Sequence, residues 1–361
     1  MNKRTIDQKE YEQEREENIG KKYKYDNPKL VDNHQKPRII KDCIYGHILI
    51  PFLCSSFMDV PEFQRLRRVR QLGMAHYTYP SAVHTRFEHS LGVMHLAGKM
   101  VDQLRKFVEI SNRTKELIQL AGMYHDIGHF AFSHLFDATL KIFSQNETNS
   151  KIPEIFKIVN HEERSVFFLS QVNSRLQLLN LNEEKFVIDL IRGHVAEKEQ
   201  SYLYQIVCNQ ECGIDVDKMD YLRRDAYHTG FPGFQSDYII LNALINQEKH
   251  IAFRSKTKSD INDLFNTRTK MHINVYQHHT SKELDKIHFC IMKRLGSRLF
   301  LYGSVTDDYN IDTLIRTSPD LSDLVKCIEY RNLHHECENC KEYGLEPNIL
   351  ESGTLSKVLF E

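Results

Sequence analysis

The chain has 361 residues, of which 41% are hydrophobic and 27% charged, and its formal net charge is -1. This composition is typical of globular proteins and excludes a chain that is disordered throughout. No apolar run reaches the roughly 18 to 20 residues that span a bilayer, so no membrane partner is expected. The near-zero charge excludes a dominant polyanion-binding role, although local basic clusters are compatible with weak binding of single-stranded nucleic acid.

The N-terminus and the cysteine content predict an intracellular protein, in either the nucleus or the cytoplasm. The stretch MNKRTIDQKEYEQERE is too charged for a secretory signal. Eight cysteines in an intracellular chain of this size are expected to be free thiols. Nineteen histidines are more than a chain of this length needs, so the search for functional residues begins with histidine.

The first segments change from polar to extended to helical. Residues 1–36 are rich in Lys, Glu, Gln and Asn and predict a charged, flexible tail. RIIKDCIYGHILI, residues 38–50, places β-branched residues around a glycine and predicts extended structure. SSFMDVPEFQRLRRVRQLG predicts a short helix that begins at Pro61 and stops before Gly73.

Helical periodicity dominates the remainder of the chain. SLGVMHLAGKMVDQLRKFV has apolar residues at helical spacing, and TKELIQLAGMYHDIG predicts a second helix with Thr114 as its N-cap. Residues 141–157 predict a polar insertion between helical parts, and HIAFRS predicts a strand among later helices. The predicted fold is therefore mainly α, with a few short strands.

Four residues have the side chains of a metal site. His125 and Asp126 lie at the end of an apolar helix, where neighbours point about 100° apart and share only one edge. Gly128 would let a ligand approach the backbone. His89 in HTRFEHS and Asp217 in GIDVDKMDY would complete a set that suits Fe, Mn, Zn or Mg and leaves coordination positions open. A His-Asp pair alone is common, so the prediction depends on its companions.

A second set of polar residues follows the first in sequence. Hydrolysis at phosphorus needs a charge clamp and a proton donor for the leaving oxygen. We expect His129 one helical turn after His125 and on the same face. His134, Asp137 and His161 are the further candidates. For each histidine alone, a hydrogen-bonded place in the core is the usual alternative.

Basic residues near these positions are candidates for binding phosphates. Arg86 precedes His89 by three residues, Lys218 follows Asp217 directly, and Arg268 stands in FNTRTK. A solvated surface charge is the usual alternative for each, and it fits Arg268 best.

Three stretches of the sequence resemble one family. QLGMAHYTYPSAVHTRFEHSLGV, AGMYHDIGHFAFSHLFD and GIDVDKMDYLRRDAYHTG carry the order H, HD, D of the HD-domain phosphohydrolases. They are similar to the deoxynucleoside triphosphate (dNTP) triphosphohydrolases that have SAM and HD domains. The resemblance implies a helical HD phosphohydrolase domain at 37–333 and a short C-terminal extension at 334–361. It also leads us to expect neither the SAM domain nor the family's C-terminal lobe.

The resemblance further implies an activity and a role for each candidate residue. The activity is hydrolysis of a dNTP to deoxynucleoside and inorganic triphosphate with a divalent metal ion, Fe, Mn, Mg or Zn. The implied metal ligands are His89, His125, Asp126 and Asp217. The residues implied around the α-phosphate are His129, His134, Asp137 and His161, with His134 as the general acid. The implied phosphate contacts are Arg86, Lys218 and Arg268. The nucleoside contacts are Gln71 and Asp225 on the 3′-hydroxyl, Tyr221 and Tyr276 against a 2′-hydroxyl, and Gln277 near the base.

The resemblance also implies a regulatory nucleotide site. Arg38, Asp59, Gln64 and Arg67 resemble the family's guanine-specific activator site, which predicts GTP or dGTP as activator and a homo-oligomer, dimer or tetramer. The plain alternative for this stretch is an amphipathic helix with a basic face. One departure weakens the prediction, because Ser322 stands where the family has an arginine.

Two alternative functions and one further motif stay open. A phosphodiesterase or nuclease of the same superfamily would share the metal set, and a non-catalytic nucleotide-sensing or nucleic-acid-binding scaffold would keep only a vestigial site. Near the C-terminus, HHECENC offers half of a zinc site, for which free surface residues are the favoured interpretation. Its candidate ligands are His334, His335, Cys337 and Cys340.

Overall fold

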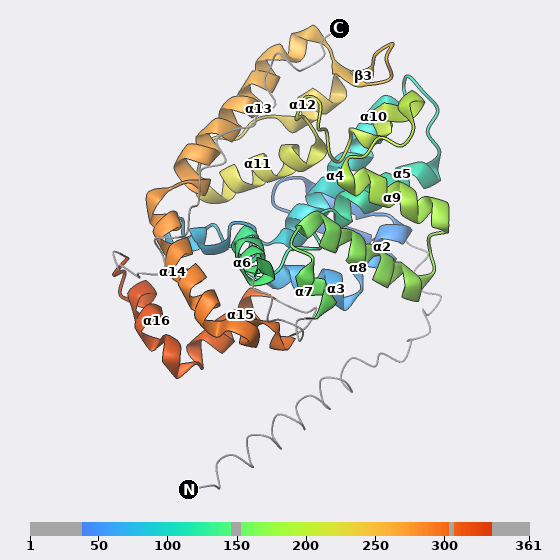
Figure 1. Cartoon of the computed structure of the whole chain (residues 1–361). Coiled ribbons are helices and arrows are strands. Elements are labelled where there is room, and N and C mark those ends of the chain that lie inside the picture. Colours follow the sequence, from blue (N-terminus) through green and yellow to red (C-terminus); the bar gives the residue numbers. More distant parts are fainter. Residues whose placement is uncertain (1–37, 146–152, 303–306, 334–361) are drawn as a thin grey trace, which may run out of the picture. The chain divides into compact units, whose positions relative to one another are not determined.

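Helices build most of the computed structural model, which describes residues 38–145, 153–302 and 307–333 (Figure 1). The mainly α prediction is confirmed. The α-helices are α2 (Phe52–Met58), α3 (Pro61–Gln64), α4 (Arg86–Leu104), α5 (Asn112–Tyr124), α6 (His134–Gln145), α7 (Glu154–Lys157), α8 (His161–Leu176), α9 (Leu181–Arg192), α10 (Ser201–Tyr204), α11 (Val216–Thr229), α12 (Ser236–Leu241), α13 (Lys258–Met271), α14 (His279–Leu295), α15 (Asp308–Arg316) and α16 (Ser322–Glu329).

Two small antiparallel sheets accompany the helices. The first pairs β1 (Arg38–Asp42) with β2 (Gly46–Ile50), so the extended prediction for RIIKDCIYGHILI is correct. The second pairs β3 (Ala243–Ile245) with β4 (Ile251–Phe253), which confirms the strand expected in HIAFRS. None of the described helices is long and apolar enough to cross a membrane.

The chain divides into two units, Met1–Pro37 and Arg38–Glu361. The predicted tail at 1–36 and the extension at 334–361, with its HHECENC motif, lie outside the described residues. Among the described cysteines, Cys290 is disulfide-bonded, so the expectation of free thiols is wrong at that position. The free cysteines are Cys43, Cys54, Cys208, Cys212 and Cys327.

Helix α4 is the central element. A capping box of Thr85 and Glu88 begins it, and most of its residues are buried because α5 packs along one side and α11 along another. A helix that is apolar nearly all round belongs inside a domain. Its first turns carry Arg86 and His89, so this largely buried helix also supplies candidate site residues.

Several predicted boundaries are wrong. The N-cap of α5 is Ser111, whose Oγ accepts from the Thr114 amide at 3.0 Å, so Thr114 lies inside the first turn. The helix that begins at Pro61 is α-helical to Gln64 and 3₁₀ from Arg65 to Arg68, so its predicted start and its predicted stop before Gly73 are correct. The insertion predicted at 141–157 is partly helical, because α6 extends to Gln145 and α7 begins at Glu154. The long segment after β4 is interrupted by a π-helix at His272–Tyr276.

A glycine on α4 sets the distance to α11. A Cβ at Gly92 would overlap the Asp220 carboxylate and lie 2.5 Å from Arg224 Nη2. Both groups are fully buried and paired with each other, so neither can move aside. The missing side chain therefore lets α11 bring Asp217 and Asp220 up to His89.

We expect Gly92→Ala to lower the free energy of unfolding by about 2 kcal/mol, because forced overpacking costs more than the roughly 1 kcal/mol that alanine gains in a helix. Urea denaturation measures this. Gly233→Ala is the matched control, since its Cβ would meet Arg223 Cγ at an ordinary 3.9 Å. Equal stability of the two variants would contradict the role given to Gly92.

Candidate active site

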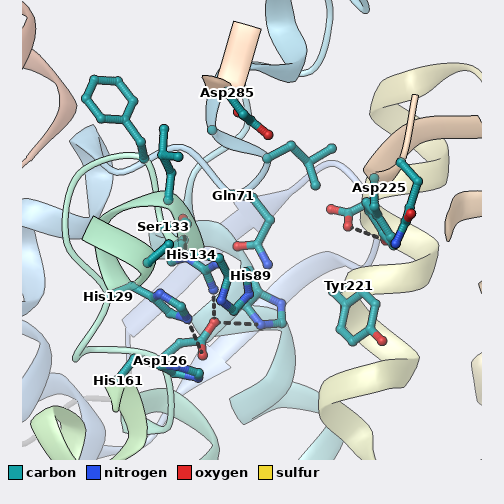
Figure 2. A pocket seen from close by; sticks show the side chains of 18 of the residues that line it. Gln71, His89, Asp126, His129, Ser133, His134, His161, Tyr221, Asp225 and Asp285 are labelled. Atoms are coloured by element: carbon teal, nitrogen blue, oxygen red, sulfur yellow. Dashed lines mark hydrogen bonds and ion pairs between the residues drawn. The ribbon is translucent and has the colours of Figure 1, made fainter. Parts of the chain in front are cut away.

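A pocket of about 500 Å³ opens between α4, α6, α11 and α14 (Figure 2). It brings together residues that are far apart in sequence. The sequence-predicted residues that line it are Gln71, Arg86, His89, Asp126, His129, His134, His161, Asp217, Tyr221, Asp225, Tyr276 and Gln277. Histidines and Asp126 crowd one end, while Asp225 and Tyr221 stand apart from them across the pocket.

The four candidate metal ligands meet at one point. Asp217 Oδ1 lies 3.2 Å from Nε2 of both His89 and His125, and each of these nitrogens is 3.5 Å from a carboxylate oxygen of Asp126. Both Nε2 atoms are buried and make no hydrogen bond. Such orphaned imidazole nitrogens beside carboxylates fit a divalent metal ion.

The outer nitrogens of the two imidazoles are already held. Asp220 Oδ2 lies 2.8 Å from His89 Nδ1, and the Gly122 carbonyl lies 2.8 Å from His125 Nδ1. Donation from Nδ1 to these acceptors leaves a lone pair on Nε2, which faces the other ligands. This arrangement is the usual support of a metal-bound histidine.

The charges at this end favour ionised carboxylates. Burial opposes ionisation of Asp126, but Arg86, which is ion-paired with it, keeps the pKa of that carboxyl well below its usual range. Burial also lowers the pKa values of His89 and His125, yet the neighbouring carboxylates outweigh it and raise both. A cation is therefore stabilised here, and a metal ion would displace protons as it binds.

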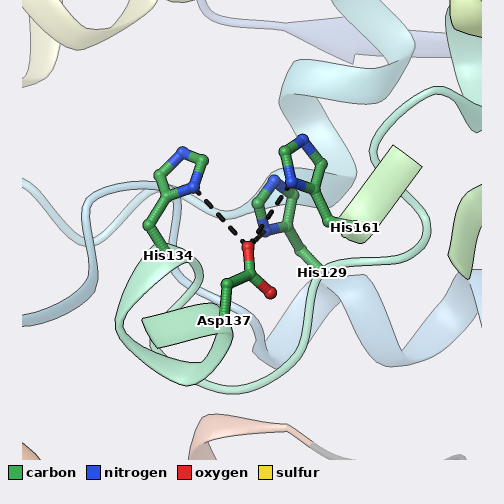
Figure 3. Close-up of side chains that lie close together, drawn as sticks. All are labelled: His129, His134, Asp137 and His161. Carbon is green, nitrogen blue, oxygen red and sulfur yellow. Dashed lines mark ion pairs between the residues drawn. The ribbon is translucent and has the colours of Figure 1, made fainter. Parts of the chain in front are cut away.

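Beside the metal group, three histidines surround one carboxylate (Figure 3). Asp137 Oδ2 lies 3.4 Å from His161 Nδ1, 3.7 Å from His134 Nδ1 and 3.9 Å from His129 Nδ1. Arg164 pairs with the other oxygen. Burial opposes ionisation of Asp137, but hydrogen bonding by His134 and His161 and the charge of Arg164 hold its pKa well below the usual range.

The histidines in this cluster differ in exposure. His129 is buried and stacks on His161, with ring centroids 4.0 Å apart. Burial, Arg86 and His161 lower its pKa well below the ordinary value. The His134 side chain is 75% exposed and lines the pocket. His129 is thus held neutral inside the protein, whereas the His134 side chain is open to the pocket.

Glycine and local backbone geometry create this cluster. Residues 125–128 form a turn after α5, so the predicted helical relation of His129 to His125 is wrong. A Cβ at Gly128 would clash with the His161 carbonyl and lie 2.6 Å from Ser165 N. Gly128 therefore admits the first turn of α8, and with it His161, instead of the ligand expected from sequence.

A strained turn presents His134. Phe132 and Ser133 have φ of 59° and 56°, in the left-handed region that most side chains avoid. Asp308 Oδ1 accepts from the Phe132 amide at 2.8 Å, and Arg86 Nε donates to Ser133 Oγ at 2.8 Å. These two bonds hold the turn so that α6 begins with His134 at the pocket.

The other end of the pocket has a different chemistry. Tyr276 donates its hydroxyl hydrogen to Asp225 Oδ2 at 2.7 Å, and His84 Nε2 lies 2.7 Å from Asp225 Oδ1. Gln71 has a buried Oε1 with no hydrogen bond. Gln277 Oε1 accepts from Lys282 Nζ at 2.8 Å. This end combines aromatic walls with hydrogen-bonding groups, as a nucleoside would need.

Four of the predicted residues do not line the pocket. His125 and Asp137 lie directly behind lining residues, as described above. Lys218 turns to Asp215, with Nζ 2.7 Å from Oδ2. Arg268 has buried Nε and Nη1 atoms without a hydrogen bond, and its charge lowers the otherwise raised pKa of Tyr221.

The four residues predicted for activator binding form two hydrogen-bonded pairs. Arg38 donates to Asp59 Oδ1 at 2.7 Å, and Arg67 Nε donates to Gln64 Oε1 at 2.8 Å. Arg67 also lies over the Phe87 ring at 3.5 Å. A nucleotide that binds to Asp59 would have to displace Arg38 from the Asp59 carboxylate.

Sequence reasoning missed several residues of the site. Asp220, Arg164 and His84 contact the predicted residues His89, Asp137 and Asp225. Of these three, only Asp220 could have been found from the sequence, because Asp220 and Arg224 have the i, i+4 spacing of a helical ion pair. Lys282 and Asp285 share a face of α14 and line the pocket beside Gln277. Burial, partly offset by Lys282, raises the pKa of Asp285 to about 7. The remaining lining residues are Leu72, Gly73, Phe132, Ser133, Leu135, Ala138 and His272.

Comparison with known proteins agrees with this geometry. The HD domain family model matches residues 86–225, from the start of α4 to Asp225. Residues 86–225 of this chain are therefore similar to the HD domain family.

The curated relatives show which proteins with this domain the chain resembles. The deoxynucleoside triphosphate triphosphohydrolase SAMHD1 homolog of Dictyostelium discoideum is 34% identical over 270 residues, covering 72% of this chain and 50% of the relative. SAMHD1 of Bos taurus is 32% identical over 345 residues, covering 82% and 58%. The putative HD domain-containing protein L394 of Acanthamoeba polyphaga mimivirus is 32% identical over 260 residues, covering 67% and 54%. The resemblance to the SAMHD1 triphosphohydrolases is confirmed, and the chain spans about half the length of these relatives.

We expect Asp220→Asn to weaken metal binding by about 10- to 100-fold, because Asp220 orients His89 and raises its basicity. A titration with Mn²⁺ measures the change. Asp42→Asn is the matched control, since Asp42 also pairs with Arg224 but does not contact His89. Equal metal affinity of both variants would assign the effect to Arg224 and contradict the role given to Asp220.

Proposed function

We propose that this chain is a metal-dependent hydrolase that splits a dNTP into deoxynucleoside and inorganic triphosphate. The observation that carries the proposal is the composition of one pocket: a metal-ligand group and a histidine cluster at one end, and the Asp225–Tyr276 pair at the other. The names of the curated relatives give the same activity to those proteins.

The reaction adds the oxygen of water to the α-phosphorus, breaks its bond to the 5′-oxygen and returns a proton to that oxygen. A divalent metal ion, when bound by His89, His125, Asp126 and Asp217, supplies an acidified water and polarises a phosphoryl oxygen. Arg86 lies between the metal group and Ser133, so its charge is placed to bind the phosphate under attack. Arg268 and Lys218 are the further candidates for the outer phosphates.

The proton donor is assigned to His134. A donor must carry a proton near neutral pH and reach the leaving oxygen. His129 fails the first condition, because its pKa is lowered well below the ordinary value. His134 lines the pocket with a side chain that is mostly exposed, so the second condition points to it, and Asp137 Oδ2 lies 3.7 Å from its Nδ1. His161 and Asp137 then position this histidine.

The sugar is assigned to the far end of the pocket. Asp225 and Gln71 are placed to bind the 3′-hydroxyl, while Tyr221 and Tyr276 close the space that a 2′-hydroxyl would occupy. The metal end holds the phosphates, so the base extends toward Gln277.

Regulation by nucleotide is a further part of the proposal. Arg38, Asp59, Gln64 and Arg67 are proposed to bind GTP or dGTP, and the bound nucleotide to promote a dimer or tetramer. The Asp59 carboxylate can accept from guanine N1 and N2 while arginines neutralise phosphate. Turnover and mass that are the same with and without GTP would contradict this.

Incubation with dGTP and Mn²⁺ should give deoxyguanosine and inorganic triphosphate, separable by ion-exchange chromatography. We expect His134→Ala to lower kcat about 100-fold or more without changing Tm, because its side chain is mostly exposed. His194→Ala is the matched control, since His194 is 67% exposed beside Asp189 but lies outside the pocket. Monophosphate products would instead favour a phosphodiesterase, and no product a non-catalytic scaffold.

We expect Tyr276→Ala to reduce the preference for dNTP over the matching ribonucleotide about tenfold or more, because it removes the wall against the 2′-hydroxyl and frees Asp225 Oδ2. The ratio of kcat/KM for dGTP and GTP measures this preference. A wild-type protein that hydrolyses both equally well would refute the assignment of these tyrosines.

A further inference from the structure

Three side chains from separate elements meet outside the pocket. Cys43 lies in the turn between β1 and β2, Glu88 in the first turn of α4, and His228 in the last turn of α11. Their ligand atoms all lie within 4.8 Å of one another, and Cys43 Sγ is 3.7 Å from His228 Nε2. None of the three lines the pocket or belongs to the candidate metal group of the active site.

The separation of sulfur and nitrogen fits a shared metal ion. In tetrahedral zinc sites the Zn–S and Zn–N distances are about 2.3 and 2.0 Å, which places the two ligand atoms about 3.6 Å apart. The observed 3.7 Å is close to this value. Thiolate, imidazole and carboxylate together form a ligand set that favours zinc over Mg²⁺ or Ca²⁺.

Each of the three residues is held in place by neighbours. Glu88 Oε1 accepts from the Thr85 amide at 2.8 Å, which fixes the carboxylate. The His228 ring stacks on His84, with centroids 4.3 Å apart and planes 10° apart, and the Ser81 hydroxyl donates to the His228 backbone carbonyl at 2.5 Å. The site is therefore largely formed before an ion arrives, which lowers the cost of binding.

The local charges also favour a cation. The nearest positive group is Arg224, whose Nη1 is 3.8 Å from Glu88 Oε2. Arg224 already pairs with Asp220 and Asp42, so its charge is compensated. Cys43 is exposed and the other two residues are half-buried, so an ion can reach them from solvent.

We propose that Cys43, Glu88 and His228 bind a zinc ion at the protein surface, with the fourth coordination position open to water. The ion would tie the β1–β2 turn to α4 and α11. It would also fix His228 against His84, whose Nε2 reaches Asp225 in the pocket. This inference does not depend on the proposed activity.

Burial, Asp42 and Glu88 raise the pKa of the Cys43 thiol, with Arg224 opposing. The free thiol is therefore a weak nucleophile, and a redox role without a metal is disfavoured. Zinc would remove the proton as it binds, because a coordinating thiol is deprotonated.

Titration of the full chain with Co²⁺ under reducing conditions tests the proposal. The active-site group contains no thiolate, so only a cysteine site gives the near-ultraviolet absorption of a thiolate–cobalt bond. We expect this absorption to saturate, to vanish in Cys43→Ser, and to need about tenfold more Co²⁺ or above in His228→Gln. Competition with Zn²⁺ should remove it.

Two variants serve as controls for other cysteines. Cys208→Ser removes a cysteine outside the group, and the double variant Cys337→Ser and Cys340→Ser removes the thiols of HHECENC. Both should keep the absorption. Absorption that persists in Cys43→Ser, or that is lost in the double variant alone, would overturn the proposal. Equal Tm of metal-free wild type and Cys43→Ser confirms that the variant is folded.

Discussion

The fold around the site depends on the buried guanidinium of Arg224. It bonds Asp220 through two nitrogens, at 2.9 and 3.0 Å, and Asp42 at 2.9 Å, with no part of its side chain exposed. A buried charge that loses its partner costs about 3 to 5 kcal/mol, so α11 and β1 must meet at this point. Asp220 in turn fixes His89 on α4. These two ion pairs of Arg224 therefore set the positions of three elements and orient the first candidate metal ligand.

A second buried arginine does the same for the histidine cluster. Arg164 donates to the carbonyl of Gly128 at 2.7 Å and pairs with Asp137, so it joins the turn after α5 to α6 and α8. His134 and His161, together with Arg164, keep the pKa of Asp137 well below its usual range, and the imidazoles of His129, His134 and His161 lie around this carboxylate. The candidate metal group and the histidine cluster thus both depend on arginine–carboxylate pairs that do not line the pocket.

The candidate metal ligands were easier to predict from the sequence than the buried residues that hold them in place. His89, His125, Asp126 and Asp217 were found because metal ligation limits the residue types and because their surroundings resemble a known family. Asp220 and Arg164 were missed, since a buried ion pair has the same residue types as a solvated one. The role of Gly128 was wrong for a related reason: whether a ligand or a helix fills the space beside a glycine depends on packing between distant segments. The predicted start of α5 was wrong because two residues that are both good N-caps, Ser111 and Thr114, lie within three positions of each other.

The strained turn before α6 links His134, the proposed general acid, to a part of the chain far away in sequence. Left-handed conformations at Phe132 and Ser133 cost of order 1 to 3 kcal/mol each, and they persist only where other contacts stabilise them. Asp308, in the first turn of α15, supplies the main contact by accepting from the Phe132 and Arg70 amides at 2.8 and 3.0 Å. Burial raises the pKa of Asp308 to about 6 despite these bonds. The position of His134 therefore depends on α15, although α15 contributes no residue to the pocket lining.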